Sequence, residues 1–154
     1  MIEETVHRRF IDNGWTLSLA ESCTGGHLAA RLTRLPGASR YFLGSLIAYS
    51  NSLKINLLKV PPALIEQHGA VSSEVASAMA TNILHLTQSD YAIAVTGIAG
   101  PDGGTPTKPV GTIWGSIASK QGVHTWQFHL SGSRDRIMEE AVDVLLKELL
   151  TLTV

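Results

Sequence analysis

Several features that define common protein classes are missing from this sequence of 154 residues. A single cysteine, Cys23, excludes an internal disulfide and a cysteine-based zinc site. The 12 basic and 13 acidic side chains leave a formal charge of −1, so no global field draws the protein toward nucleic acid or an anionic membrane. No apolar run approaches the ~20 residues of a membrane-spanning helix. We therefore expect neither nucleic acid nor a membrane as a partner.

The sequence also lacks the motifs of several catalytic classes. Its six histidines do not have the H-E-x-x-H spacing, so we expect no metal ion. A Walker A loop, a dinucleotide fingerprint and a G-x-S-x-G elbow are all missing. Residues 1–4 include two acids where a secretory signal would carry bases, which favours a cytoplasmic location.

Apolar residues, by contrast, make up 44% of the chain and charged residues only 16%, which is typical of a protein with a substantial core. A chain of this length buries about 68–70% of the surface that its unfolded form exposes. We therefore expect one domain over residues 1–154.

Hydrophobic periodicity and turn residues predict alternating helices and strands. We expect helices over 2–13, 25–35, 72–87 and 134–150, with two short ones within 52–68. We expect strands over 15–20, 42–50, 91–95, 110–119 and 122–130. Residues 91–95 are apolar on both faces, which is typical of a central strand, whereas 122–130 alternate as at an edge. The pattern predicts an α/β fold, a three-layer α/β/α sandwich with a mixed sheet.

The most informative segment is the turn after the first predicted strand. It reads Ala20-Glu21-Ser22-Cys23-Thr24-Gly25-Gly26. A strand that ends in hydroxyls and opens through two glycines onto a helix places a nucleophile beside unpaired backbone N–H donors. This geometry suits attack on a carbonyl or binding of a phosphate.

Ser22 needs a base, because an unassisted serine attacks poorly at neutral pH. Lys54, which follows a polar strand end, is the best candidate, since a desolvated lysine can act as a base. Tyr49 is placed to hydrogen-bond between the two. Two alternatives stay open: Ser22 and Thr24 could simply cap a helix, and Cys23 could compete as nucleophile, although a lone cysteine is more often a packing residue.

Two further segments are candidates for ligand binding. The loop after the strand at 91–95 contains glycines 97, 100, 103 and 104, and either approaches a ligand closely or forms only a wide turn. Within it, Asp102 either orients a substrate or caps the turn. Arg134 begins the last predicted helix, where it could bind a phosphate or pair with Asp135 or Glu139.

Five runs of residues occur together in the order found in one known family. They are Ala20 to Gly26, Ala48 to Asn51 with Lys54, His68 to Ser72, Thr96 to Gly104, and Lys108 to Thr112. Together they resemble the C-terminal domain of the CinA (competence/damage-inducible) family, which also occurs as a stand-alone nicotinamide-nucleotide amidase of the PncC type. The resemblance spans nearly the whole chain.

This resemblance implies hydrolysis of the carboxamide of nicotinamide mononucleotide (NMN) to nicotinate mononucleotide and ammonia, with no cofactor. By position, Ser22 would be the nucleophile, Lys54 the base and Tyr49 an aid to proton movement. The substrate-binding residues would be Cys23, Thr24, Gly25, Gly26, Thr96, Gly97, Gly100, Asp102, Gly103, Thr112 and Arg134. The N–H groups at 23–26 are the nearest supply for an oxyanion.

The resemblance also implies self-association, and we expect a homodimer. One departure concerns the phosphate: relatives commonly place an arginine where this chain has Met138, and Arg136 is the only nearby substitute. Two other functions stay open, a non-catalytic nucleotide-binding or regulatory domain and an amidase for another amide nucleotide.

Overall fold

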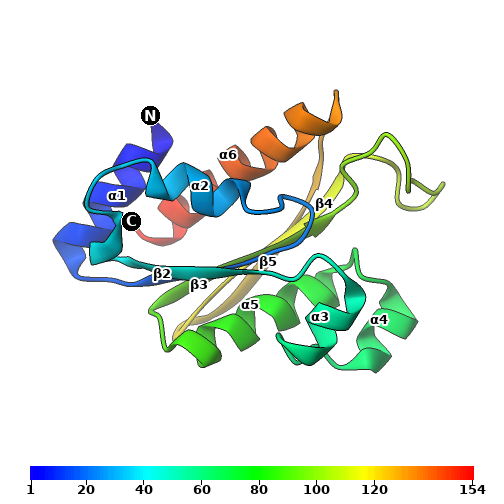
Figure 1. Cartoon of the computed structure of the whole chain (residues 1–154), viewed down its shortest axis with the longest axis horizontal. Helices are drawn as coiled ribbons and strands as arrows, with labels where there is room; N and C mark the ends of the chain where they lie inside the picture. The colour runs from blue at the N-terminus through cyan, green and yellow to red at the C-terminus, as the bar shows by residue number, and fades with distance from the viewer.

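A five-stranded sheet runs through the middle of the molecule, and the computed structural model describes all residues, 1–154 (Figure 1). Its strands are β1 (Leu17–Glu21), β2 (Phe42–Ile47), β3 (Tyr91–Gly97), β4 (Thr112–Ser119) and β5 (Gly122–His129). The order is β2-β1-β3-β4-β5, in which β1 is parallel to β2 and β3, while β4 is antiparallel to β3 and β5. The mixed sheet, the central β3 and the edge strand β5 are confirmed.

Helices cover both faces of the sheet, which confirms the three-layer sandwich (Figure 1). On one face lie α1 (Ile2–Asn13), α2 (His27–Thr33) and α6 (Arg134–Leu152). On the other face lie α3 (Asn51–Asn56), α4 (Pro62–His68) and α5 (Ser73–Thr87). A short 3-10 helix, Ala38–Arg40, leads into β2.

Alternation along the central strands divides the core into two apolar clusters. In β3, Ile93 and Val95 point toward the α1, α2 and α6 layer, whereas Ala92 and Ala94 point toward α5. Small side chains on the second face let α5 pack close to the sheet. In α5 itself, Ser72 caps the first turn by accepting from the Val75 N–H at 3.3 Å, as its sequence predicts.

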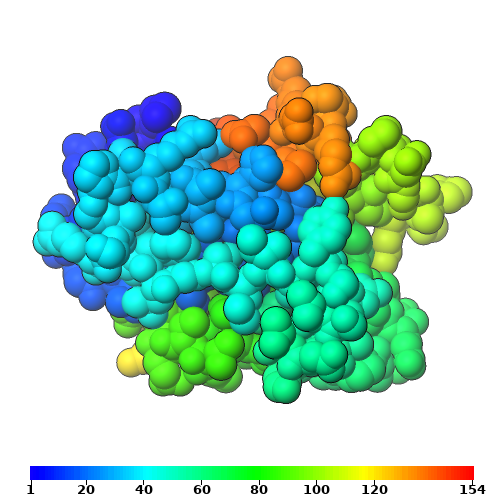
Figure 2. All heavy atoms as spheres, viewed as in Figure 1, coloured from blue at the N-terminus to red at the C-terminus, as the bar shows by residue number.

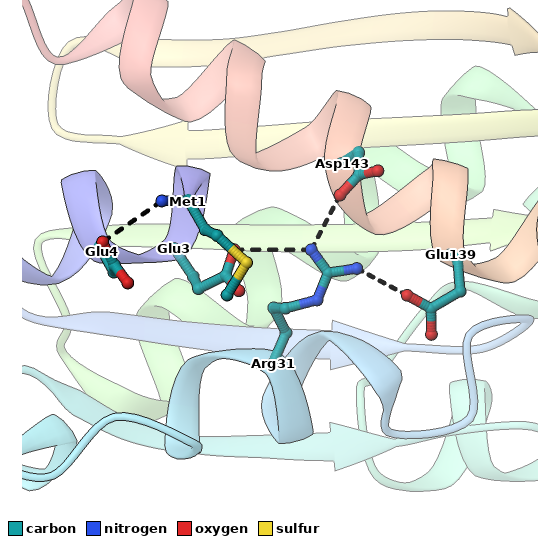
Figure 3. Close-up of polar contacts among 6 residues, drawn as sticks. All are labelled: Met1, Glu3, Glu4, Arg31, Glu139 and Asp143. Carbon is teal, nitrogen blue, oxygen red and sulfur yellow. Dashed lines mark hydrogen bonds and ion pairs between the residues drawn. The ribbon is translucent and has the colours of Figure 1, made fainter.

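Arg31 joins the three helices of one layer (Figure 3). The sequence places it opposite the leucines of α2, yet its side chain is only 13% exposed. Its guanidinium lies 3.6 Å from Glu3 of α1, and 2.6 Å and 2.8 Å from Glu139 and Asp143 of α6. Three carboxylates around one cation thus link α1 and α6 through α2.

The parallel strands β1, β2 and β3 all end at the same edge of the sheet, where the segments that follow them converge. Figure 2 shows the start of α6 in orange touching the segment after β2, with the yellow-green loop after β3 beside them. The segments that carry most of the predicted functional residues therefore meet at this edge of the sheet.

None of the helices combines the length and the apolar character that a membrane-spanning helix needs.

Candidate active site

The structure brings Ser22 and Lys54 into direct contact. Ser22 follows β1, and its N–H donates to the Val95 carbonyl of β3 at 3.0 Å, which anchors the turn to the sheet. Lys54 lies in α3, the short helix that begins four residues after β2, and its Nζ is 2.8 Å from Ser22 Oγ. The two residues are 7% and 1% exposed, so their contact is largely shielded from bulk water.

The environment of Lys54 favours a neutral amine. Burial lowers the pKa of Lys54, and none of the ion pairs of the protein includes this residue. Besides Ser22, its Nζ contacts the carbonyl oxygens of Ala48 and Tyr49, at 2.9 Å and 3.1 Å. Both carbonyls only accept, so once the amine is neutral they take its two N–H bonds and its lone pair can face the Ser22 hydroxyl. In that form the amine has the orientation that a general base needs.

Cys23 does not share these properties. It is buried, and burial raises the pKa of its thiol to about 12. Because the thiolate is the nucleophilic form, the thiol is unreactive near neutral pH. Cys23 lines the cavity as a packing residue, and it belongs to the larger apolar cluster.

A cavity of about 270 Å³ opens beside the Ser22–Lys54 pair. Besides Ser22 and Lys54, its lining includes eight other residues that the sequence predicts, namely Cys23, Tyr49, Thr96, Gly97, Gly100, Asp102, Gly103 and Arg134. The lining also includes five residues that sequence reasoning did not select, Asn51, Ala70, Val71, Ile98 and Ala99. All five lie within or beside the runs that carry the family resemblance, so that signal could have found them.

Tyr49 and Arg134 meet at the mouth of the cavity. Arg134 donates to the Tyr49 hydroxyl at 2.8 Å and to the Gly100 carbonyl at 2.6 Å. The expected bridging position of the Tyr49 hydroxyl between Ser22 and Lys54 is wrong, because those two side chains touch directly and the hydroxyl instead bonds Arg134. Arg134 pairs with neither of the acidic neighbours considered for it, Asp135 and Glu139.

Three residues of the Ser22 turn lie outside the cavity lining. The Thr24 hydroxyl and the Gly26 N–H both donate to the Glu21 carboxylate, at 2.8 Å and 3.2 Å. The Gly25 N–H donates to the Ser22 carbonyl at 3.0 Å. Gly25 and Gly26 therefore have no N–H group left for a ligand, while those of Cys23 and Thr24 donate to no other residue.

Two further candidates also lie elsewhere. Thr112 is fully buried, and its hydroxyl donates to the Pro109 carbonyl at 2.6 Å, so it supports the base of the loop after β3. Arg136 pairs with Glu140 and lines a separate hollow with His129, so it does not replace an arginine at position 138 in this cavity. No group of three or more His, Cys, Asp or Glu side chains is arranged to hold a metal ion.

Comparison with known proteins agrees with this architecture along the whole chain. The family model for the CinA C-terminal domain matches residues 1–153. This chain belongs to the CinA family. A CinA-like protein of Geobacter metallireducens is 49% identical over 154 residues, which cover 97% of this chain and 37% of the relative. A CinA-like protein of Synechococcus sp. is 52% identical over 135 residues, covering 88% and 32%.

Solved structures of CinA-family proteins have the same fold. The competence damage-inducible protein A from Klebsiella pneumoniae is 34% identical, with a TM-score of 0.93 over 96% of this chain and 92% of that one. The competence/damage inducible protein CihA from Agrobacterium tumefaciens is also 34% identical, with a TM-score of 0.94 over 100% and 97%. The chain spans about a third of the length of the curated CinA-like relatives, 37% of the Geobacter protein for example.

Proposed function

We propose that this CinA-family domain is an amidohydrolase that converts NMN and water to nicotinate mononucleotide and ammonia. The observation that carries the proposal is the buried 2.8 Å contact between Ser22 Oγ and the Lys54 amine. A serine beside a neutral, oriented amine is an activated nucleophile, and a carboxamide is a carbonyl that such a nucleophile attacks. The family resemblance of the sequence supplies the substrate.

Ser22 would bond to the carboxamide carbon while its proton moves to Lys54 Nζ. The tetrahedral intermediate then collapses, and Lys54 returns the proton to the departing nitrogen, which leaves as ammonia. A water molecule attacks the acyl-enzyme, with Lys54 taking one of its protons, and the product leaves as Ser22 regains its own. Burial of Lys54 matters at each step because it disfavours the protonated amine and so keeps the base available.

Among the N–H groups of the Ser22 turn, those of Cys23, which lines the cavity, and of Thr24, which does not, are the ones free to bond a developing oxyanion. They directly follow the nucleophile and donate to no other residue, whereas the next two N–H groups along the chain are already bonded. One donor of this kind is typically worth about 2.7–4 kcal/mol in the transition state.

Arg134 supports the nucleotide part of the proposal. Its guanidinium lies at the cavity mouth, held by Tyr49 and Gly100, where a phosphate could form charge-assisted hydrogen bonds with it. The cavity interior is left for the nicotinamide ring and its carboxamide.

The test is incubation of the purified protein with NMN, measuring ammonia and separating the two nucleotides by chromatography. We expect the native protein to release one ammonia for each nicotinate mononucleotide formed, and Ser22→Ala to release none. Ser119→Ala, in the β4–β5 hairpin, is a matched control that keeps the activity. Release by Ser22→Ala at the native rate would contradict the nucleophile alone.

Absence of release by the native protein would contradict the proposed function. In that case calorimetric binding of NMN would favour the nucleotide-binding or regulatory alternative. Turnover of another amide nucleotide in a substrate panel would instead keep the chemistry and change the substrate.

A further inference from the structure

Glu21, the last residue of β1, carries the most densely bonded carboxylate in the protein. It is fully buried and directly precedes the nucleophile. Its Oε1 accepts from the Thr24 hydroxyl at 2.8 Å and from the N–H groups of Gly26 and Leu28 at 3.2 Å and 2.9 Å. Its Oε2 accepts from the Ala29 N–H at 3.2 Å and from the Ser45 hydroxyl at 2.9 Å.

These five donors compensate a carboxylate that has no cation beside it. An isolated buried carboxylate is strongly unfavourable, so each donor that faces Glu21 is held there by the charge. Four of the five donors belong to residues 24–29, the turn and the first residues of α2. Glu21 therefore fixes the main chain on the far side of the turn that presents Ser22.

The same bonds determine which N–H groups near Ser22 remain without an acceptor. Those of Gly26, Leu28 and Ala29 point at Glu21, so the Cys23 and Thr24 groups are the ones left between them and Ser22. Thr24 is itself tied to Glu21 by its hydroxyl. We propose that Glu21 is a positioning residue, which holds the Cys23 and Thr24 N–H groups where an oxyanion forms on an acyl group attached to Ser22. This inference rests on the proposed hydrolysis.

The charge pattern explains why this position needs a carboxylate. Backbone N–H groups face both oxygens, Gly26 and Leu28 at Oε1 and Ala29 at Oε2. A glutamine amide has one oxygen and one NH2 group, so either orientation turns a donor toward a donor. Glu21→Gln keeps the size of the side chain and removes this match.

The test uses 4-nitrophenyl acetate as a small acyl donor beside NMN. Ser22 Oγ bonds to the acetyl carbon, the ester bond breaks, and 4-nitrophenolate leaves with the bonding electrons while the Ser22 proton moves to Lys54. The amplitude of the nitrophenolate burst counts folded active sites, and its rate constant reports stabilisation of the oxyanion. A merely structural role would lower the amplitude, not the rate constant per site.

In Glu21→Gln we expect the acylation rate constant and the kcat for NMN to fall about 100-fold, which is the effect of losing one oxyanion donor. The burst amplitude should stay at the native value, and the KM for NMN should stay within about threefold of it. Ser45→Ala, which removes a donor outside the turn, should stay within about threefold of the native rate. If Glu21→Gln does not fold, Thr24→Val carries the test: its rate should fall about tenfold, and Thr24→Ser should restore it.

A native rate constant in Glu21→Gln, or in Thr24→Val, would overturn the proposal, as would a loss confined to burst amplitude or to KM. Failure of the proposed function looks different: the native protein would be acylated by 4-nitrophenyl acetate at a rate that depends on Glu21, yet would release no ammonia from NMN. A native protein that reacts with neither compound would overturn both.

Discussion

Two glycine-containing segments at the same edge of the sheet are built in opposite ways. The turn after β1, residues 21–26, is mostly buried and its polar groups bond to one another through Glu21. The loop after β3 is exposed over residues 101–107 and is tied to its surroundings at Gly100, which Arg134 contacts, and at Lys108, which bonds the His68 carbonyl. Under the proposed function, the first segment would fix the reacting groups and the second would shape the mouth where a ligand enters.

Replacing the base should give the largest effect if the buried segment performs the chemistry. In Lys54→Met we expect kcat/KM to fall about 10²- to 10⁴-fold, because Ser22 loses its proton acceptor. Lys54→Arg should fall as far, since a guanidinium does not deprotonate. Steady-state ammonia release measures both, and Lys120→Met in the hairpin turn is the control. Retained activity in Lys54→Arg would show that the residue serves only as a positive charge.

The pH dependence should report the same amine. Burial lowers the pKa of Lys54 from its ordinary 10.5, and the base works only when unprotonated. As pH falls through this lowered pKa the ammonium form accumulates, so kcat/KM should drop about tenfold per pH unit below it. The profile of the native protein should therefore rise with pH and have its midpoint below 10.5. If the residual activity of Lys54→Met still falls at low pH in the same way, the fall belongs to another group.

At the cavity mouth the expected effect is on binding. Arg134→Ala should raise KM for NMN about 10- to 100-fold with a smaller change in kcat, since a hydrogen bond to a charged group contributes about 1.5–3 kcal/mol. Arg136→Ala is the matched control, because Arg136 pairs with Glu140 in a separate hollow and should leave KM unchanged. Equal effects of the two variants would place the phosphate elsewhere and remove the distinction between the two segments.

The smallest effects should distinguish the packed start of the second segment, at the end of β3, from its exposed part. A Cβ at Gly97, the last residue of β3, would lie 2.4 Å from Ile113 Cδ1 and 2.8 Å from the Thr112 carbonyl oxygen, so Gly97→Ala should lower the free energy of unfolding by about 3 kcal/mol. At Gly103 the nearest atom is 3.7 Å away and only the φ of +91° opposes a side chain, so the expected loss is about 1 kcal/mol. Denaturant titration compares the two, and the reverse order would contradict this account.

The fold could be predicted largely from local patterns. Apolar periodicity and turn residues predict every strand and α-helix, though not the 3-10 helix Ala38–Arg40. The spacing of Val75, Met79 and Ile83, for example, predicts a stripe whose three side chains are all buried in α5. Element ends were less accurate: the predicted strand 42–50 ends at Ile47, because the polar residues after it belong to the approach to α3. The sequence places Arg31 opposite the leucines of α2, but it does not show that carboxylates of α1 and α6 lie against its guanidinium.

The contact at the centre of the site was also predictable, since the chemistry of serine requires a base and Lys54 follows a neighbouring strand. Tyr49 and Thr112 show the limit of that reasoning. Residue type and strand position brought both to the correct edge of the sheet, yet the direction of each hydroxyl depends on tertiary partners, Arg134 for one and Pro109 for the other. Glu21 was overlooked because a buried acid beside a nucleophile has no periodic signal.

The Ser22–Lys54 contact joins β1 to α3, the short helix that follows β2, and β2 is an edge strand that pairs only with β1. Edge strands open before the central strands of a sheet. Gentle warming should therefore separate Ser22 from Lys54 while most of the molecule remains ordered. Turnover should then be lost at a lower temperature than the circular dichroism signal of the helices, and it should return on cooling.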